Sequence, residues 1–228
     1  MNKIAILASG EGTTAETFIR AAQRHEIDAE IVLVICNREN AGILKRIENL
    51  NHEFGLHIQT KLINSKTHPA DSGEIVEKGA QTVAEETAIL EELQQNELDL
   101  IVLMGYLRRL GPKLVNEFGY HSDYASPYQA MMLNSHPGLL PETAGTFGIN
   151  TQRLTLEKGM PFGGQTLHAV SEIYDDGPVI AEYKVKVEPN DTPESLFARV
   201  QTTEKEHLPG DIGAFMEDRQ LYFRGNKG

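Results

Sequence analysis

The chain has 228 residues, and its 21 Lys and Arg against 33 Asp and Glu give a net charge of −12. This acidic balance argues against binding to the phosphate backbone of nucleic acids, because that affinity comes mainly from Lys and Arg. The single cysteine, Cys36, excludes an internal disulfide and a thiolate metal cluster. The sequence contains no signal peptide and no apolar run of roughly 20 residues that could span a bilayer, so we expect a globular cytoplasmic protein.

Alternating strands and helices are predicted for the first part of the chain. Continuous apolar runs predict buried parallel strands at 4–8, 29–36, 98–104 and 130–133, and helical patterns separate most of them at 13–25, 41–50 and 73–96. We expect the first helix to begin with Thr13 and Glu16 in a capping box. We expect the third to carry one solvated acidic face, formed by Glu85, Glu86, Glu91 and Glu92. The alternation predicts an α/β fold with a Rossmann-like, mostly parallel open sheet.

The pattern changes after residue 160. Residues 164–171 and 179–187 predict two strands that pair as an antiparallel hairpin across the turn at 174–178. Asp191 as N-cap, with Glu194 three residues later, predicts the start of a final helix. No repeat or low-complexity linker interrupts the sequence. We therefore expect one domain over 1–228, with a parallel half at 1–137 and a second half at 138–228.

A glycine-containing loop, Ser9-Gly10-Glu11-Gly12-Thr13-Thr14, lies where the first strand ends and the first helix begins. Free backbone N–H groups and the helix dipole favour an anion at such a position, and two threonine hydroxyls are available. The loop lacks the lysine of a nucleoside-triphosphate loop and the third glycine of a dinucleotide motif. From the loop alone, a phosphate site and a simple strand-to-helix turn with Thr13 as N-cap both remain open.

Asn134 and His136 follow an expected parallel strand, at the edge where open α/β sheets bind ligands. Their spacing puts both on one face of an extended chain, a conformation that Pro137 favours. An amide can hydrogen-bond a developing oxyanion and an imidazole can transfer protons near neutral pH, which together suit acyl transfer. The alternative is that Asn134 satisfies turn backbone and His136 packs in the core. His168 has the same two interpretations, substrate contact or hydrogen-bonded core residue.

Several segments, taken in order, resemble the folate-dependent formyltransferase family. They are the loop at 9–13, Met104-Gly105-Tyr106-Leu107-Arg108-Arg109-Leu110, Asn134-Ser135-His136-Pro137 with Leu139-Leu140-Pro141, Gly164-Gln165-Thr166-Leu167-His168, Asp175-Asp176-Gly177-Pro178-Val179-Ile180, and Arg199-Val200-Gln201-Thr202 with Glu204. The resemblance implies an enzyme of one-carbon metabolism. It would transfer the formyl group of 10-formyltetrahydrofolate to the amine of glycinamide ribonucleotide in de novo purine biosynthesis, through a tetrahedral intermediate.

The resemblance also implies roles for individual residues. Asn134 would hold the formyl oxygen, His136 would donate a proton, and Asp175 would raise the pKa of the histidine and order a water. The ribonucleotide would contact Gly12, Thr13, Thr14, Gln201, Thr202, Thr203 and Glu204. The folate would contact Leu107, Arg108, Arg109, Leu110, Asn134, Ser171, Glu172, Ile173, Tyr174 and Asp175, although Arg108 and Arg109 can also be a surface pair. The implied partners are these small molecules, with no metal, nucleic acid or membrane.

Departures from the family pattern leave the acceptor open. Thr13-Thr14 stands where Ser-Asn is expected, and Glu142-Thr143-Ala144-Gly145 replaces a Tyr-Pro-Gly-like stretch. Residues 120–130 resemble an insertion that forms a surface loop or a lid. The alternatives are formylation of an amino sugar or of methionyl-tRNA, hydrolysis of the formyl group, and a non-catalytic nucleotide-binding module. Length and acidic charge argue against the tRNA acceptor, and the early first strand argues against a hydrolase with an N-terminal regulatory domain.

Overall fold

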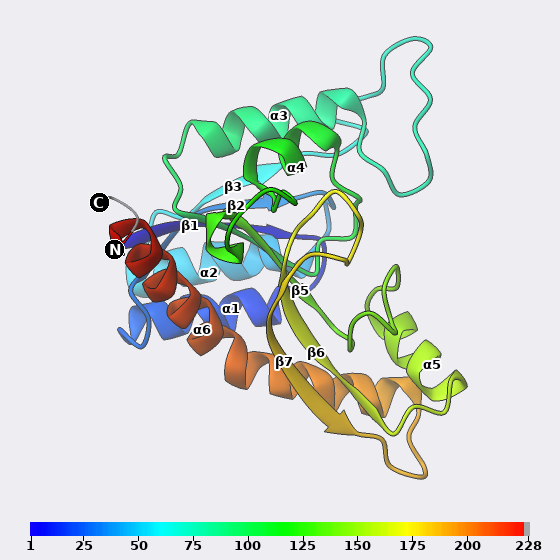
Figure 1. Cartoon of the computed structure of the whole chain (residues 1–228). Helices are drawn as coiled ribbons and strands as arrows, with labels where there is room; N and C mark the ends of the chain where they lie inside the picture. Colours follow the sequence, from blue (N-terminus) through cyan, green and yellow to red (C-terminus); the bar gives the residue numbers. More distant parts are fainter. Residues whose placement is uncertain (226–228) are drawn as a thin grey trace.

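The computed structural model of the chain describes residues 1–225. One seven-stranded sheet with the order β3-β2-β1-β4-β5-β6-β7 runs through the molecule (Figure 1). The strands are β1 (Asn2–Ala8), β2 (Ala29–Cys36), β3 (Gln59–Leu62), β4 (Leu100–Met104), β5 (Met132–His136), β6 (Phe162–Ala169) and β7 (Val179–Lys186). Neighbours among β1 to β5 pair in parallel, whereas β6 is antiparallel to both β5 and β7. The predicted mostly parallel sheet with a C-terminal antiparallel hairpin is confirmed.

Helices cover both faces of the sheet. They are α1 (Thr13–Gln23), α2 (Gly42–Phe54), α3 (Val83–Gln94), α4 (Pro112–Phe118), the 3-10 turn η1 (Pro127–Gln129), α5 (Ile149–Glu157) and α6 (Pro193–Gly225). Helices α1, α2 and α6 lie on one face, and α3 and α4 lie on the other (Figure 1). Alternate residues of β1 show why both faces are apolar. Ile4 packs in the core cluster that contains Phe18 of α1, and Ala5 in the cluster that contains Ile89 of α3.

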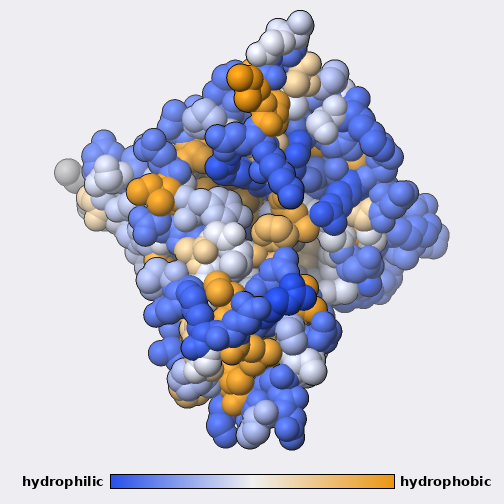
Figure 2. Space-filling view, turned by 90° about the vertical axis from the view of Figure 1, so that its right-hand side faces the viewer, coloured by the Kyte–Doolittle hydropathy of each residue, from blue (hydrophilic) through white to orange (hydrophobic). Residues whose placement is uncertain are grey.

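The strand order reverses between β1 and β4, because the chain proceeds from β1 to β2 and β3 on one side and resumes with β4 on the other. Open α/β sheets bind ligands at the carboxyl edge of such a switch point. Viewed from the right-hand side of Figure 1, the molecule is hollowed near its middle, with apolar residues in the hollow and mostly hydrophilic residues around it (Figure 2). No helix within residues 1–225 is both long enough and apolar enough to cross a membrane.

The first helix begins differently from the prediction. Its N-cap is Gly12, with φ of +74°, and no side chain caps the helix. The carboxylate of Glu16 instead forms ion pairs with Arg20 and Arg46. The expected Thr13–Glu16 capping box is therefore wrong, because two arginines outcompete a backbone N–H for this carboxylate. The start of α1 is left with uncapped N–H groups beside the glycine loop.

The last helix also begins one residue later than predicted. Thr192, rather than Asp191, caps it: its hydroxyl accepts from Ser195 N at 3.2 Å, and its own N–H donates to Ser195 Oγ at 3.0 Å. Asp191 is bound by the Arg199 guanidinium, with 2.7 Å between Nη1 and Oδ1. The helix then runs as far as Gly225 with Pro209 inside it.

The predicted helix at 73–96 is only partly present. Helix α3 begins after Thr82, which forms a capping box with Glu85, and the preceding residues form an irregular segment. The expected solvated acidic face is wrong for Glu85 and Glu86, which are buried, whereas Glu91 is exposed and Glu92 is half-buried. Glu85 binds Arg108, with 2.6 Å between Oε2 and Nη2, and Glu86 accepts the backbone N–H of Lys113 at 2.5 Å. Both acidic side chains thus hold the segment after β4 against α3.

Residues 120–130 form a surface loop packed on α6. The ring of Tyr128 lies 5.4 Å from that of Phe215, and its hydroxyl donates to Asp218 at 2.9 Å. Arg219 donates to the carbonyl oxygens of Tyr128 and Ala130. These contacts fix residues 128–130 against the far part of α6, which favours the surface loop over the lid.

Candidate active site

Asn134 and His136 project from the last three residues of β5, at the carboxyl edge of the sheet, because β5 extends through the whole Asn-Ser-His segment. Asp175 lies in the turn between β6 and β7, where its φ of +57° directs the carboxylate back toward β5. The distance between His136 Nδ1 and Asp175 Oδ2 is 3.7 Å, and both side chains are buried. The structure therefore brings together the three residues singled out as catalytic candidates.

The hydrogen-bond network assigns the protonation of the His136 ring. Thr143 Oγ1 donates its proton to the carbonyl oxygen of Leu139 at 2.8 Å, so it accepts from His136 Nε2–H at 3.0 Å. The proton of the neutral ring is thus on Nε2. Nδ1 carries the free lone pair and faces Asp175.

A second histidine, His168, completes the cluster. Its Nδ1–H donates to the carbonyl oxygen of Ala169 at 3.0 Å, which leaves Nε2 to accept from Asn134 Nδ2 at 3.0 Å. Nε2 also lies 3.6 Å from Asp175 Oδ1. His168 therefore fixes which way the Asn134 amide points and keeps its NH₂ group on the side of the other site residues.

Burial controls the electrostatics of the cluster. It lowers the pKa of His136 to about 4, helped by the nearby His168 and opposed by a hydrogen bond with the backbone of Thr143. Burial also raises the pKa of Asp175, against the effect of a hydrogen bond from Gly145 N. Desolvation is therefore the main influence on the histidine pKa in the ligand-free protein, and the expected effect of Asp175 on it stays a prediction. At neutral pH the His136 ring is uncharged.

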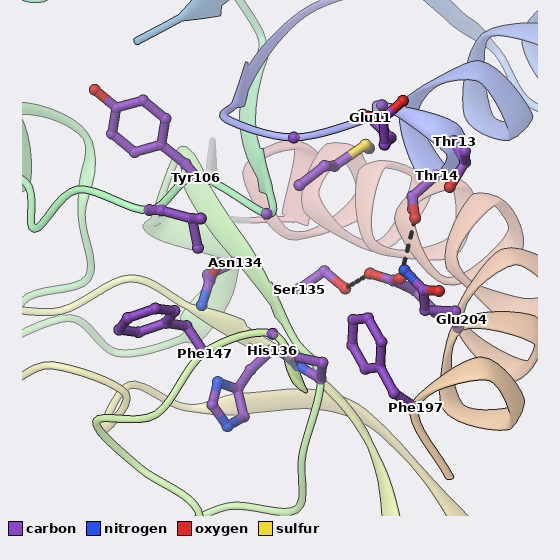
Figure 3. A pocket seen from close by; sticks show the side chains of 18 of the residues that line it. Glu11, Thr13, Thr14, Tyr106, Asn134, Ser135, His136, Phe147, Phe197 and Glu204 are labelled. Atoms are coloured by element: carbon purple, nitrogen blue, oxygen red, sulfur yellow. Dashed lines mark hydrogen bonds between the residues drawn. The ribbon is translucent and has the colours of Figure 1, made fainter. Parts of the chain in front are cut away.

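A cavity of about 210 Å³ lies between this cluster and the start of α1. Figure 3 shows Thr13 and Thr14 at one end of it, Asn134 and His136 at the other, and Glu204 of α6 at the side. The loop passes close to α2: a Cβ atom added to Gly12 would lie only 2.3 Å from Ile43 Cδ1. The uncapped N–H groups of α1 and the neighbouring threonine hydroxyls can bind a phosphate, and such a site does not require a lysine.

A family model described as formyl transferase matches residues 2–212, which include the cluster and the cavity. The chain belongs to the formyl transferase family. A phosphoribosylglycinamide formyltransferase of Bacillus subtilis is 28% identical over 228 residues, covering 100% of this chain and 98% of that protein. A protein of the same name from Haemophilus influenzae is 32% identical over 219 residues, covering 96% of this chain and 89% of its own length. A crystal structure of a phosphoribosylglycinamide formyltransferase from Brucella melitensis superposes with a TM-score of 0.72 at 33% identity, covering 94% and 95% of the two chains.

In this formyl transferase the residues expected to bind the ribonucleotide lie only partly at the cavity. Gly12, Thr13, Thr14, Gln201 and Glu204 line it, but Thr202 and Thr203 do not. Thr202 is exposed, and its hydroxyl donates to the carbonyl oxygen of Ala198 at 3.0 Å. The reason is helical periodicity, because Gln201 and Glu204 share one face of α6 and the two residues between them turn away.

The residues expected to bind folate surround a second, adjoining cavity. It is lined by Leu103, Tyr106, Arg108, Arg109, Leu110, Val115, Asn134, His168, Val170, Ser171, Glu172, Tyr174 and Asp175. Leu107 lines the first cavity instead, and Ile173, which is 67% exposed, lines neither. The two cavities share Tyr106, Asn134 and Tyr174, so the ligands they hold would meet beside these residues, of which Asn134 is a catalytic candidate. Each cavity takes residues from before and after residue 137.

The two arginines of the second cavity differ. Arg108 pairs with the fully buried Glu85, which fixes its guanidinium. Arg109 pairs with Glu77, and both of these side chains are more than half exposed. Because an exposed ion pair contributes little free energy, Arg109, unlike Arg108, can exchange its carboxylate partner for a ligand.

Sequence reasoning missed Thr143, Phe147 and Phe197 and left His168 undecided. Phe147 and Phe197 line the first cavity from loops and helices that carry no motif. Thr143 belongs to a segment that departs from the family pattern. The signal for His168 was strand register, because it lies directly opposite Asn134 in the antiparallel β5–β6 pair. Among residues 1–225, no group of three or more His, Cys, Asp or Glu side chains is placed to hold a metal ion.

Proposed function

We propose that this formyl transferase moves the formyl group of 10-formyltetrahydrofolate to the primary amine of glycinamide ribonucleotide, a step of de novo purine biosynthesis. One observation carries the proposal: the cavity beside the phosphate-type loop contains Asn134 and His136, Asn134 also lines the second cavity, and Asp175 faces Nδ1 of the imidazole. The names of the Bacillus and Haemophilus relatives support this acceptor. The enzyme would act in the cytoplasm on small molecules.

The ribonucleotide would occupy the first cavity. Its phosphate would accept hydrogen bonds from the backbone N–H groups of Gly12, Thr13 and Thr14 and from the Thr13 hydroxyl, where no basic side chain is required. Glu204 would accept from ribose hydroxyls, and Gln201 lies one turn before it on the same helix face. The amine of the substrate would then extend toward Asn134 and His136.

The second cavity has the chemistry expected of a folate site. Its apolar residues Leu103, Leu110, Val115 and Val170 suit the faces of a flat ring, and the backbone at 171–175 offers hydrogen bonds to a polar ring edge. Arg109, with its exposed partner Glu77, would bind the carboxylates of the glutamate tail. The formyl group that this co-substrate supplies would lie beside Asn134, which lines both cavities.

Asn134 and His136 would have different roles in the transfer. One Nδ2 hydrogen of Asn134 is held by His168, and the other would donate to the formyl oxygen as negative charge develops there. The lone pair on His136 Nδ1 would take the proton that the attacking amine releases, because the ring is neutral at pH 7. It would deliver that proton to the departing folate nitrogen. One C–N bond forms, one breaks, and one proton moves between the two nitrogens.

This assignment changes the role expected for His136. A ring with a pKa of about 4 cannot begin as the proton donor at neutral pH, so it must first act as a base. Asp175 would stabilise the imidazolium during the short time that it carries the proton. The carboxylate would therefore act mainly on the rate of the chemical step.

Acceptor identity is tested by offering the purified protein 10-formyltetrahydrofolate with one acceptor at a time. The panel contains glycinamide ribonucleotide, an amino-sugar nucleotide, initiator methionyl-tRNA, and water alone. Release of tetrahydrofolate is followed by absorbance, and the formylated product is identified by mass. We expect transfer to glycinamide ribonucleotide only. Transfer to another acceptor, or hydrolysis at the same rate without any acceptor, would overturn the assignment.

A further inference from the structure

Ser135 lies between the two catalytic candidates on β5, and its side chain points to the other side of the strand. Its hydroxyl donates to Glu204 Oε1 on α6. The second carboxylate oxygen, Oε2, accepts from Thr14 Oγ1 at 3.0 Å. Both hydrogen bonds are drawn in Figure 3. One carboxylate thus joins the strand that carries Asn134 and His136 to the loop at the start of α1.

The direction of the Ser135 hydroxyl is set from its other side. Gln165 on β6 is fully buried, and its Nε2 lies 3.4 Å from Ser135 Oγ as donor. This contact occupies a lone pair of the serine oxygen and leaves its proton for Glu204. The Oε1 atom of Gln165 is buried without a hydrogen-bond partner. Leaving this oxygen unpaired costs free energy, which the hydrogen bonds among Gln165, Ser135, Glu204 and Thr14 must offset.

Glu204 depends on these donors because it is only 8% exposed, so little water reaches its carboxylate. Burial raises the pKa of its carboxyl group, and the hydrogen bonds from Ser135 and Thr14 lower it. Removing one hydroxyl would favour the protonated acid. A protonated acid has fewer lone pairs for a ligand, and its plane is no longer fixed by two donors.

We propose that Ser135 is a positioning residue that determines specificity for the phosphoribosyl acceptor, by holding the Glu204 carboxylate oriented toward the first cavity. The inference rests on the proposed function, in which Glu204 accepts hydrogen bonds from ribose hydroxyls. Ser135 itself need not touch the substrate. It acts on ribonucleotide binding through Glu204, although it is flanked by the residues that act on the formyl group.

The test compares Ser135→Ala with wild type at pH 7.5, in steady-state kinetics and in calorimetric binding of the ribonucleotide. The variant should raise the KM and Kd for the ribonucleotide about tenfold, as expected for losing a hydrogen bond to a charged group. The kcat and the KM for folate should stay within twofold. Ser135→Thr, which keeps the hydroxyl, should restore ribonucleotide binding to within twofold.

Tyr183→Phe is the matched control. The Tyr183 hydroxyl donates to the carboxylate of Asp211 at 2.7 Å, which is also on α6 but outside both cavities, so its loss should leave all kinetic constants unchanged. Ribonucleotide affinity equal to wild type in Ser135→Ala, or an equal rise in the KM of both substrates, would overturn the proposal. If Ser135→Ala does not fold, Ser135→Cys, a weaker donor of similar size, should give an intermediate loss, and unchanged affinity there would overturn it. Failure of wild type to formylate the ribonucleotide while still binding it would count against the proposed function alone.

Discussion

His136 Nδ1 and Asp175 Oδ2 lie 3.7 Å apart, and neither side chain is more than 3% exposed. This separation exceeds a direct hydrogen bond, so the neutral ring of the ligand-free protein is not bonded to the carboxylate. In the dry surroundings of the two side chains, a positive charge on the ring would nevertheless be attracted strongly by a carboxylate at this distance. Asp175 is therefore placed to stabilise the ring only while it carries the transferred proton.

Asp175→Asn should lower kcat about a hundredfold and change the KM for either substrate less than threefold, because the interaction is made mainly in the transition state. Asn also tolerates the positive φ at this position. Steady-state kinetics at saturating substrates measures the effect. Asp176→Asn, at the neighbouring exposed position of the same turn, is the control and should behave as wild type. A kcat within threefold of wild type for Asp175→Asn would contradict the role of this carboxylate.

Thr143→Val should lower kcat about tenfold without unfolding the protein. The valine has the shape of threonine but cannot accept from His136 Nε2–H, so the ring loses the partner that keeps its free lone pair on Nδ1. Thr155→Val is the matched control, because the Thr155 hydroxyl is also buried and donates to a carbonyl four residues earlier, as Thr143 does. If both variants lose the same fraction of kcat, the effect belongs to packing and not to the His136 tautomer.

His136 should make the stability of the protein pH-dependent. Its pKa is about 4 in the folded state against 6.5 for an unperturbed ring, so the unfolded chain binds a proton first as the pH falls. This contribution is complete above pH 6.5 and is lost as the pH falls toward 4; at pH 5 the loss amounts to about 2 kcal/mol. Urea unfolding of wild type and His136→Gln at pH 7.5 and pH 5 measures it. The stability of wild type relative to the variant should decrease by that amount, and a pH-independent difference would contradict the buried neutral ring.

Gly12→Ala should damage both the fold and the phosphate site. A Cβ there would meet Ile43 at 2.3 Å and would stand on a residue with φ of +74°, so we expect a loss of about 2–3 kcal/mol of stability. The KM for the ribonucleotide should rise at least tenfold, since the N–H groups of the loop would shift. Gly10→Ala, whose Cβ would meet no atom within 4 Å, is the stability control. Thermal unfolding and KM values that are equal in the two variants would contradict the close approach of loop and α2.

The fold was largely predictable because the central strands are buried on both faces and carry continuous apolar runs, as in β1 and β4. Strand β3, at the edge of the sheet, has the sequence Gln-Thr-Lys-Leu and no such run, so it was missed. The acidic residues of α3 were misread for a different reason. Glu85 and Glu86 are buried by Arg108 and Lys113, more than 20 residues away, and such distant partners leave no local pattern.

The candidate site was predictable where a motif carried it. Asn134 and His136 alternate on one strand, and a turn with an aspartate is a recognisable unit, so these three were found. Burial lowers the pKa of His136, and burial cannot be read from spacing, so we propose a base where the resemblance implies a proton donor. Thr143 and Ser135 act through hydrogen bonds to residues whose positions only the folded chain sets.

In this account the formyl group passes directly between two bound substrates, while Asn134 stabilises the formyl oxygen and His136 transfers the proton. The direct test is transfer of an isotopically labelled formyl group from 10-formyltetrahydrofolate to glycinamide ribonucleotide, measured in parallel for wild type, Asn134→Ala and His136→Ala. We predict one labelled product per tetrahydrofolate released by wild type, and rates at least a hundredfold lower for each variant with its folding intact. No labelled ribonucleotide from wild type, or near-normal turnover by either variant, would contradict the account.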